Sequence, residues 1–190
     1  SEQFQIENKL TPGFMKIELR NIHKHYGSVR ANNGISFVVR AGTIHGVLGE
    51  NGAGKSTLMR LLVGYTPKTS GEILIDDRAV DIASPAHALD MGIGMLYQDP
   101  MDFPRLSVLD NFMLKKDGPL WISKKKMQLK FEEISRHLGF DLDPQAILQR
   151  LTVGERQQLE LVRLLMMDVK VLILDEPTTG ISDIQKDLLF

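Results

Sequence analysis

A short glycine-rich segment constrains this chain more than any other feature. Residues 49–56 read Gly-Glu-Asn-Gly-Ala-Gly-Lys-Ser, which matches the pattern G-x-x-x-x-G-K-S/T. A largely apolar run at 43–48 predicts a strand before it, and residues 55–63 have the spacing of a helix with one apolar face. Strand, glycine-rich turn and helix in this order distinguish a phosphate-binding P-loop from an ordinary glycine turn.

The residues of this loop have separate expected roles. Glycines let the backbone amides turn inward around phosphate oxygens, and the N-terminus of the following helix adds a partial positive charge. Lys55 is expected to reach the β- and γ-phosphates, Ser56 to offer its hydroxyl to Mg²⁺, and Thr57 to lie near the α-phosphate. The expected nucleotide-binding residues of the loop are Gly49, Asn51, Gly52, Ala53, Gly54, Lys55, Ser56 and Thr57.

Two carboxylates follow the most apolar run of the chain. Residues 169–174 have the composition of a central strand covered on both faces, and Asp175 and Glu176 come directly after them. Asp175 is expected to hold Mg²⁺ through water, and Glu176 to orient or deprotonate the water that attacks the γ-phosphate. Taken alone, these residues could also be the polar end of a strand. The P-loop earlier in the chain favours the catalytic interpretation.

The remaining patterns predict an α/β fold. Strands are expected at 15–20, 35–39, 43–48, 72–75, 93–97 and 169–174. Ser84 is expected to cap a short helix that opens with Pro85, and Ser107 to cap another with Asp110. A mostly helical block lies between the last two strands. One of its helices is predicted from an apolar stripe of Met127, Phe131, Ile134 and Leu138.

Composition limits the classes of function. The chain has 190 residues and a hydrophobic share of 43%, which predicts a globular core, and residues 1–14 are interpreted as a tail. Its formal charge of −1 disfavours a nucleic-acid-binding module. The absence of cysteine excludes a disulfide scaffold, a Cys-ligated zinc site and a thiol nucleophile. No apolar run approaches the roughly 20 residues that span a bilayer.

A third segment, between the P-loop and the carboxylates, carries a family resemblance. Residues 151–157 read Leu-Thr-Val-Gly-Glu-Arg-Gln and resemble the LSGGQ-type signature of ATP-binding-cassette ATPases. Gly154 is kept and Thr152 preserves the hydroxyl, whereas Val153 replaces a glycine and Glu155 the glutamine. Thr152 and Glu155 also form a capping-box pattern, and both interpretations can hold because a capped helix N-terminus can bind a γ-phosphate. The resemblance implies that Thr152, Gly154 and Glu155 contact the nucleotide across a dimer interface.

Two further positions extend the resemblance to most of residues 15–182. Tyr26 occupies the position of the family's adenine-stacking aromatic, although it could also be an ordinary tyrosine between two strands. Gln98, after the strand at 93–97, matches the Q-loop glutamine that ligates Mg²⁺ and hinges the helical subdomain.

The family fold implied by these matches is a RecA-like P-loop NTPase core with an N-terminal antiparallel β subdomain and an inserted helical subdomain. The core would comprise residues 15–98 and 164–190, and the helical signature subdomain residues 99–163.

The chain departs from the family pattern after the carboxylates. The family commonly reads S-A-L-D where residues 179–182 read Thr-Gly-Ile-Ser, with Asp183 one step late. The chain stops at Phe190, before the switch histidine of a complete cassette, and its 5 histidines all precede Asp175. These departures resemble the first cassette of tandem ATPases that serve bacterial simple-sugar and nucleoside importers. The chain is therefore expected to be a C-terminally truncated cassette from a longer protein.

The resemblance implies an ATP-binding subunit that hydrolyses MgATP to drive import of a sugar or nucleoside, with Glu176, Lys55 and Gln98 as catalytic residues. The implied partners are a second ATP-binding cassette in a head-to-tail dimer, permease subunits docking near Gln98 and the helical subdomain, and a substrate-binding protein indirectly, with no nucleic acid. The expected location is cytoplasmic, on the inner face of the membrane. Two alternatives stay open: a soluble cassette ATPase acting on ribosomes or DNA, and a nucleotide-binding piece with negligible turnover. Small-molecule kinases share the P-loop but not the order of the other segments.

Overall fold

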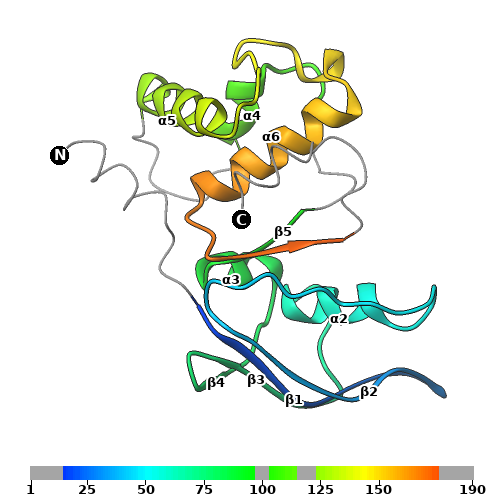
Figure 1. Cartoon of the computed structure of the whole chain (residues 1–190). Coiled ribbons are helices and arrows are strands. Elements are labelled where there is room, and N and C mark those ends of the chain that lie inside the picture. The colour runs from blue at the N-terminus through cyan, green and yellow to red at the C-terminus, as the bar shows by residue number, and fades with distance from the viewer. Residues whose placement is uncertain (1–14, 97–102, 115–122, 176–190) are drawn as a thin grey trace. The chain divides into compact units, whose positions relative to one another are not determined.

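The computed structural model describes residues 15–96, 103–114 and 123–175. The chain divides into two units, Ser1–Met95 with Asp168–Ile173, and Leu96–Met167 with Leu174–Phe190. Figure 1 shows the elements of both, and each unit is considered by itself. The predicted tail at 1–14 lies outside the described residues.

An antiparallel sheet forms much of the first unit. Its strands are β1 (Ile17–Tyr26), β2 (Val29–Val39), β3 (Ser70–Ile75) and β4 (Arg78–Val80). Their order in the sheet is β2-β1-β3-β4, with β1 in the sheet interior (Figure 1). Alternate residues of β1 enter the core, since Ile17 and Leu19 are buried while Arg20 is exposed. The predicted strands at 15–20, 35–39 and 72–75 are confirmed, and β4 is an addition to them.

Tight turns join the paired strands. Tyr26 pairs with Val29, and the intervening Gly27 has φ 58°, as a type II′ hairpin turn requires at its first central position. Asp76 and Asp77 have φ 47° and 65°, the conformation of a type I′ turn, and they connect β3 to β4.

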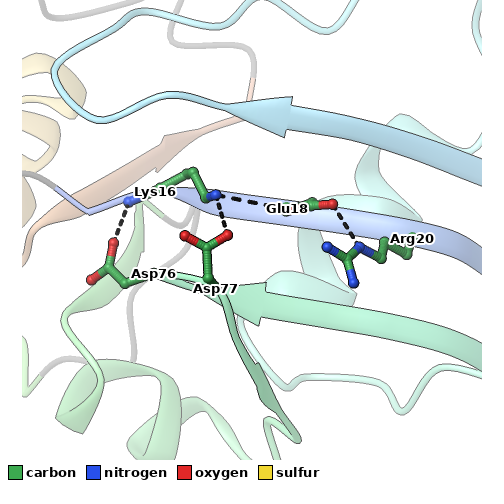
Figure 2. A network of polar contacts seen from close by, with 5 residues as sticks. All are labelled: Lys16, Glu18, Arg20, Asp76 and Asp77. Atoms are coloured by element: carbon green, nitrogen blue, oxygen red, sulfur yellow. Dashed lines mark hydrogen bonds and ion pairs between the residues drawn. The ribbon is translucent and has the colours of Figure 1, made fainter.

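A polar network holds the β3–β4 turn against β1 (Figure 2). The Lys16 backbone amide donates to Asp76 Oδ1 at 2.9 Å, and the Lys16 ammonium pairs with Asp77. Arg20 Nε donates to Glu18 Oε1 at 2.6 Å on the same strand. These contacts fix two strained aspartates by giving both side chains a partner.

The predicted strand at 43–48 is wrong. This segment has no regular secondary structure and none of the described strands pairs with it. Ile44 is 70% exposed and Leu48 is 95% exposed. His45 stacks on Phe37 of β2 with ring centroids 4.9 Å apart. An apolar run can form a strand only beside a hydrogen-bonding neighbour, and no described residue fills that role.

Two helices and two short strands complete the described part of the first unit and reach its boundary. Helix α2 (Lys55–Leu62) buries Leu58 and Leu61, and Gly64, with φ 66°, ends it as predicted. Helix α3 (Pro85–Asp90) is capped by Ser84. Strands β5 (Ile93–Leu96) and β6 (Val171–Leu174) pair with each other.

Strand β6 departs from its predicted environment. Val171, Leu172 and Leu174 are half-buried, and only Ile173 of this strand is fully buried. Coverage of both faces is therefore not seen among the described residues, although the strand itself is confirmed.

Helices dominate the second unit, as predicted. They are α4 (Val108–Leu114), α5 (Lys124–His137), α6 (Val153–Met166) and a 3-10 turn at Leu148–Arg150. The predicted stripe of α5 is buried, and its Phe131 meets Phe112 of α4 edge-to-face at 5.5 Å. Arg163 of α6 lies over the same Phe112 ring at 5.1 Å. Within the described residues, no helix has the length and apolar character that a membrane crossing requires.

Candidate functional site

The P-loop makes a tight turn before α2. Ala53 N donates to Glu50 O at 3.1 Å, and Gly52 and Gly54 have φ 82° and 88°, a region that glycine enters without strain. Gly54 is the N-cap of α2 and provides no side-chain hydrogen bond, and the first turn of α2 contains no acidic residue. The helix N-terminus therefore offers its amides and its partial positive charge to an anion rather than to a capping side chain.

Strand β2 holds the end of this loop in place. A Cβ on Gly54 would lie 2.1 Å from Ala31 O and 2.8 Å from Asn32 Nδ2, so no side chain fits there. Asn32 is buried and its Nδ2 donates to Gly54 O at 3.1 Å. The glycine at 54 is thus required both by its backbone conformation and by the close approach of β2.

Lys55 lies folded over the loop that precedes it. Its Nζ donates to Gly49 O at 2.7 Å and to Glu50 O at 2.9 Å. Lys55 as a whole is half-buried, and the next residue, Ser56, is exposed. The Lys55 ammonium and the uncapped amides of α2 thus belong to the same short loop, which is the arrangement that binds phosphate in a P-loop.

Tyr26 belongs to the same unit as the P-loop. It is the last residue of β1, directly before the hairpin turn, and 50% of its surface is exposed. The Lys24 Nζ lies 4.7 Å from the centroid of its ring. A half-exposed aromatic ring at a strand end is suited to stacking on a flat ligand group.

The signature segment forms a capping box at the start of α6. Glu155 N donates to Thr152 Oγ1 at 3.2 Å, while Glu155 Oε2 accepts from Thr152 N and from Thr152 Oγ1, both at 2.7 Å. These bonds, first from the Thr152 backbone amide and then from its hydroxyl, hold the pKa of the Glu155 carboxyl below its ordinary value. Val153 is 70% exposed and Gly154 lies in the first helical turn. The capping interpretation is confirmed, and the contact of this segment with nucleotide stays a prediction.

The remaining candidates cannot be placed beside the P-loop. Asp175 directly follows β6, is half-buried and belongs to the second unit with the signature segment. Gln98 and Glu176 lie outside the described residues. Tyr26 and residues 49–57 therefore belong to one unit, and the approach of the other groups to them stays a prediction.

Sequence reasoning missed Lys24 and Asn32. Both are buried polar side chains beside the candidate site. Alternation from Ile17 and Leu19 places Lys24 on the opposite, exposed face of a regular strand. The sequence contains no clear signal for the bulge that turns Lys24 inward.

Comparison with known proteins identifies the family. A family model described as ABC transporter matches residues 32–179. The chain belongs to the ABC transporter family. This ABC transporter chain is 40% identical over 172 residues to the arabinose import ATP-binding protein AraG 1 of Burkholderia cenocepacia, covering 90% of the chain and 34% of that relative. It is 37% identical over 179 residues to the ribose import ATP-binding protein RbsA of Lacticaseibacillus paracasei, covering 93% and 36%.

The ABC transporter chain thus spans about a third of the length of these relatives. Solved structures agree with its fold. A nucleotide-free ATP-binding cassette from an ABC transporter matches with a TM-score of 0.75 at 23% identity, over 92% of this chain and 74% of that one. The cbiO1 protein of Clostridium perfringens, part of the transporter complex cbiONQ, matches with a TM-score of 0.74 at 25% identity, over 93% and 72%. The predicted family and the α/β P-loop fold class are confirmed.

Proposed function

We propose that this chain is the nucleotide-binding part of an importer ATPase that hydrolyses MgATP to drive uptake of a simple sugar. The proposal rests on the geometry of the P-loop. The N-terminus of α2 has no capping side chain, and the Lys55 ammonium is held over the loop by hydrogen bonds to two backbone carbonyls. The names of the relatives, arabinose and ribose import ATP-binding proteins, favour a pentose-like sugar over a nucleoside.

The triphosphate would bind along residues 49–57. Backbone amides at the start of α2 would face its oxygens, and the Lys55 ammonium would exchange its carbonyl partners Gly49 and Glu50 for the β- and γ-phosphates. Tyr26 would stack on the adenine, as the family resemblance implies.

The donor groups present suit Mg²⁺. The Ser56 hydroxyl and the Asp175 carboxylate are hard oxygen donors, which Mg²⁺ prefers, and Gln98 would add an amide oxygen. Bound Mg²⁺ would neutralise charge that develops on the phosphoryl oxygens. Glu176 would orient the attacking water and accept its proton, and Lys55 would stabilise the γ-phosphoryl group during in-line displacement.

The assembly proposed from the resemblance needs a second cassette. In a head-to-tail dimer, Thr152, Gly154 and Glu155 of one cassette would face the P-loop of the other. Permease subunits would dock near Gln98 and the helical subdomain at residues 99–163, and this docking would hold the chain at the cytoplasmic face of the membrane. A substrate-binding protein would deliver the sugar to the permease and would not contact this chain.

Replacing the proposed general base tests the function. In the full-length protein assembled with its permease, Glu176→Gln should lower ATP turnover at least about 100-fold while MgATP still binds, because the amide cannot accept the proton of the attacking water. Phosphate release and uptake of labelled arabinose or ribose are the measurements. Glu133→Gln is the matched control, since Glu133 is exposed on α5. Full ATP turnover in Glu176→Gln would show that Glu176 is not the general base. If the unaltered protein hydrolysed ATP regardless of sugar and took up no sugar, the proposed import function would be wrong.

A further inference from the structure

Two buried polar side chains lie opposite each other in the β1–β2 hairpin. Lys24 is 8% exposed and Asn32 is 4% exposed, and the two residues are partners in the strand register. Directly opposed residues of an antiparallel pair project to the same face of the sheet. This pair therefore directs two buried polar side chains, one of them charged, to the same face of the hairpin.

The Lys24 ammonium has two contacts. Its Nζ donates to Pro67 O at 2.7 Å and lies 4.7 Å from the centroid of the Tyr26 ring. No ion pair among the described residues includes Lys24. A buried charge is costly without compensation, so the carbonyl and the face of the ring must supply it.

A β-bulge brings Lys24 to this position. Asn21 has φ 48°, and the β1–β2 register shifts between Leu19 and Ile22. After this shift Ile22 and Lys24 are buried, as Leu19 is before it. The contact of the Lys24 ammonium with the Tyr26 ring places Tyr26 on the same face as Lys24. Gly71 makes room for the bulge, because a Cβ there would lie 2.3 Å from Asn21 O. The hairpin is therefore built so that Lys24 and Tyr26 share one face.

The paired residues Lys24 and Asn32 contact the chain on either side of α2. Asn32 binds Gly54 O at the N-terminus of this helix. Lys24 binds Pro67 O in the segment that follows the helix, where Thr69 N also donates to His23 O at 2.8 Å. Tyr26 is thus held in a fixed relation to the P-loop through contacts within one unit.

We propose that Lys24 is a positioning residue that holds the Tyr26 ring in place for stacking on the base of a bound nucleotide. The proposal rests on the nucleotide binding proposed above and adds a residue that acts through Tyr26. The ammonium lies over the ring, and Tyr26 as a whole is still 50% exposed, which leaves surface for contact with a purine base.

The test compares a ligand that has a base with one that lacks it. The chain is titrated calorimetrically with MgATP and with magnesium tripolyphosphate. Lys24→Met keeps the apolar stem and removes the charge, and it should weaken MgATP binding about 3- to 10-fold while tripolyphosphate binding changes less than about 2-fold. Lys24→Arg should restore MgATP affinity. Tyr26→Ala should produce the base-dependent loss by itself, and adding Lys24→Met to it should cause no further loss.

Matched variants separate positioning from general damage. Lys16→Met removes the same charge beside the other end of β1 and should leave the affinities for both ligands unchanged. Equal weakening of both ligands by Lys24→Met would show a merely structural role and overturn the proposal, as would unchanged MgATP affinity or additive losses with Tyr26→Ala. Failure of the unaltered chain to bind either ligand would instead overturn the nucleotide site itself.

Discussion

At the level of single residues, the close approach of β2 determines where the P-loop can accept a side chain. Gly52 and Gly54 both have positive φ, but their surroundings differ. A Cβ on Gly52 meets nothing within 4 Å, whereas one on Gly54 would overlap the carbonyl oxygen of Ala31. Conformational freedom is needed at both positions, and absence of a side chain is needed only at Gly54.

This difference predicts unequal losses of stability. Gly54→Ala should lower the free energy of unfolding by at least about 2 kcal/mol more than Gly52→Ala, because both substitutions strain φ and only the first displaces β2. Urea unfolding of the two variants measures this difference directly. Equal losses would show that β2 does not restrict the loop at Gly54.

At the scale of elements, helix boundaries follow local chemistry more closely than strands do. Ser84, Ser107 and Thr152 each accept the hydrogen bond expected of a cap. These bonds connect residues three apart, so the sequence contains the information that specifies them. The strand expected at 43–48 failed, and Lys24 was missed, because strand pairing and bulges depend on distant segments.

The capping box of α6 gives a pH-dependent prediction. The pKa of Glu155 is lowered in the folded chain, so its stabilisation is complete above the ordinary carboxyl pKa and is lost as the pH falls through the lowered value. Glu155→Gln should therefore lower the stability of the chain at pH 7, by about 0.5 to 1 kcal/mol for an exposed cap. The gap between the two proteins should close as the pH falls below about 4.5.

Thermal unfolding of both proteins between pH 7 and pH 3 measures this gap. Glu133→Gln is the control. It removes the same negative charge, and Glu133 lies outside the first turn of α5, where it has no capping role. A gap between Glu155→Gln and the unaltered chain that stayed constant across this range would contradict the assigned capping role.

For the whole molecule, the sequence predicts the individual segments of the site but not how those segments are arranged in space. The order of P-loop, signature and carboxylates along the chain predicts the family, and the match over residues 32–179 confirms it. Tyr26 and residues 49–57 belong to one unit, and Thr152, Glu155 and Asp175 to the other. Contacts between such distant segments are not specified by local sequence patterns, so the sequence predicts the residues of each part and not how the parts meet.

We propose that residues 49–57 bind the phosphates of MgATP through Lys55. Calorimetric titration of the chain with MgATP tests it most directly, with Lys55→Ala as the variant and Lys125→Ala as a control at an exposed lysine of α5. We expect the unaltered chain and Lys125→Ala to bind MgATP equally, and Lys55→Ala to bind it at least about 10-fold more weakly, because a charge-assisted phosphate contact is lost. Unchanged affinity in Lys55→Ala would show that Lys55 does not hold the phosphates.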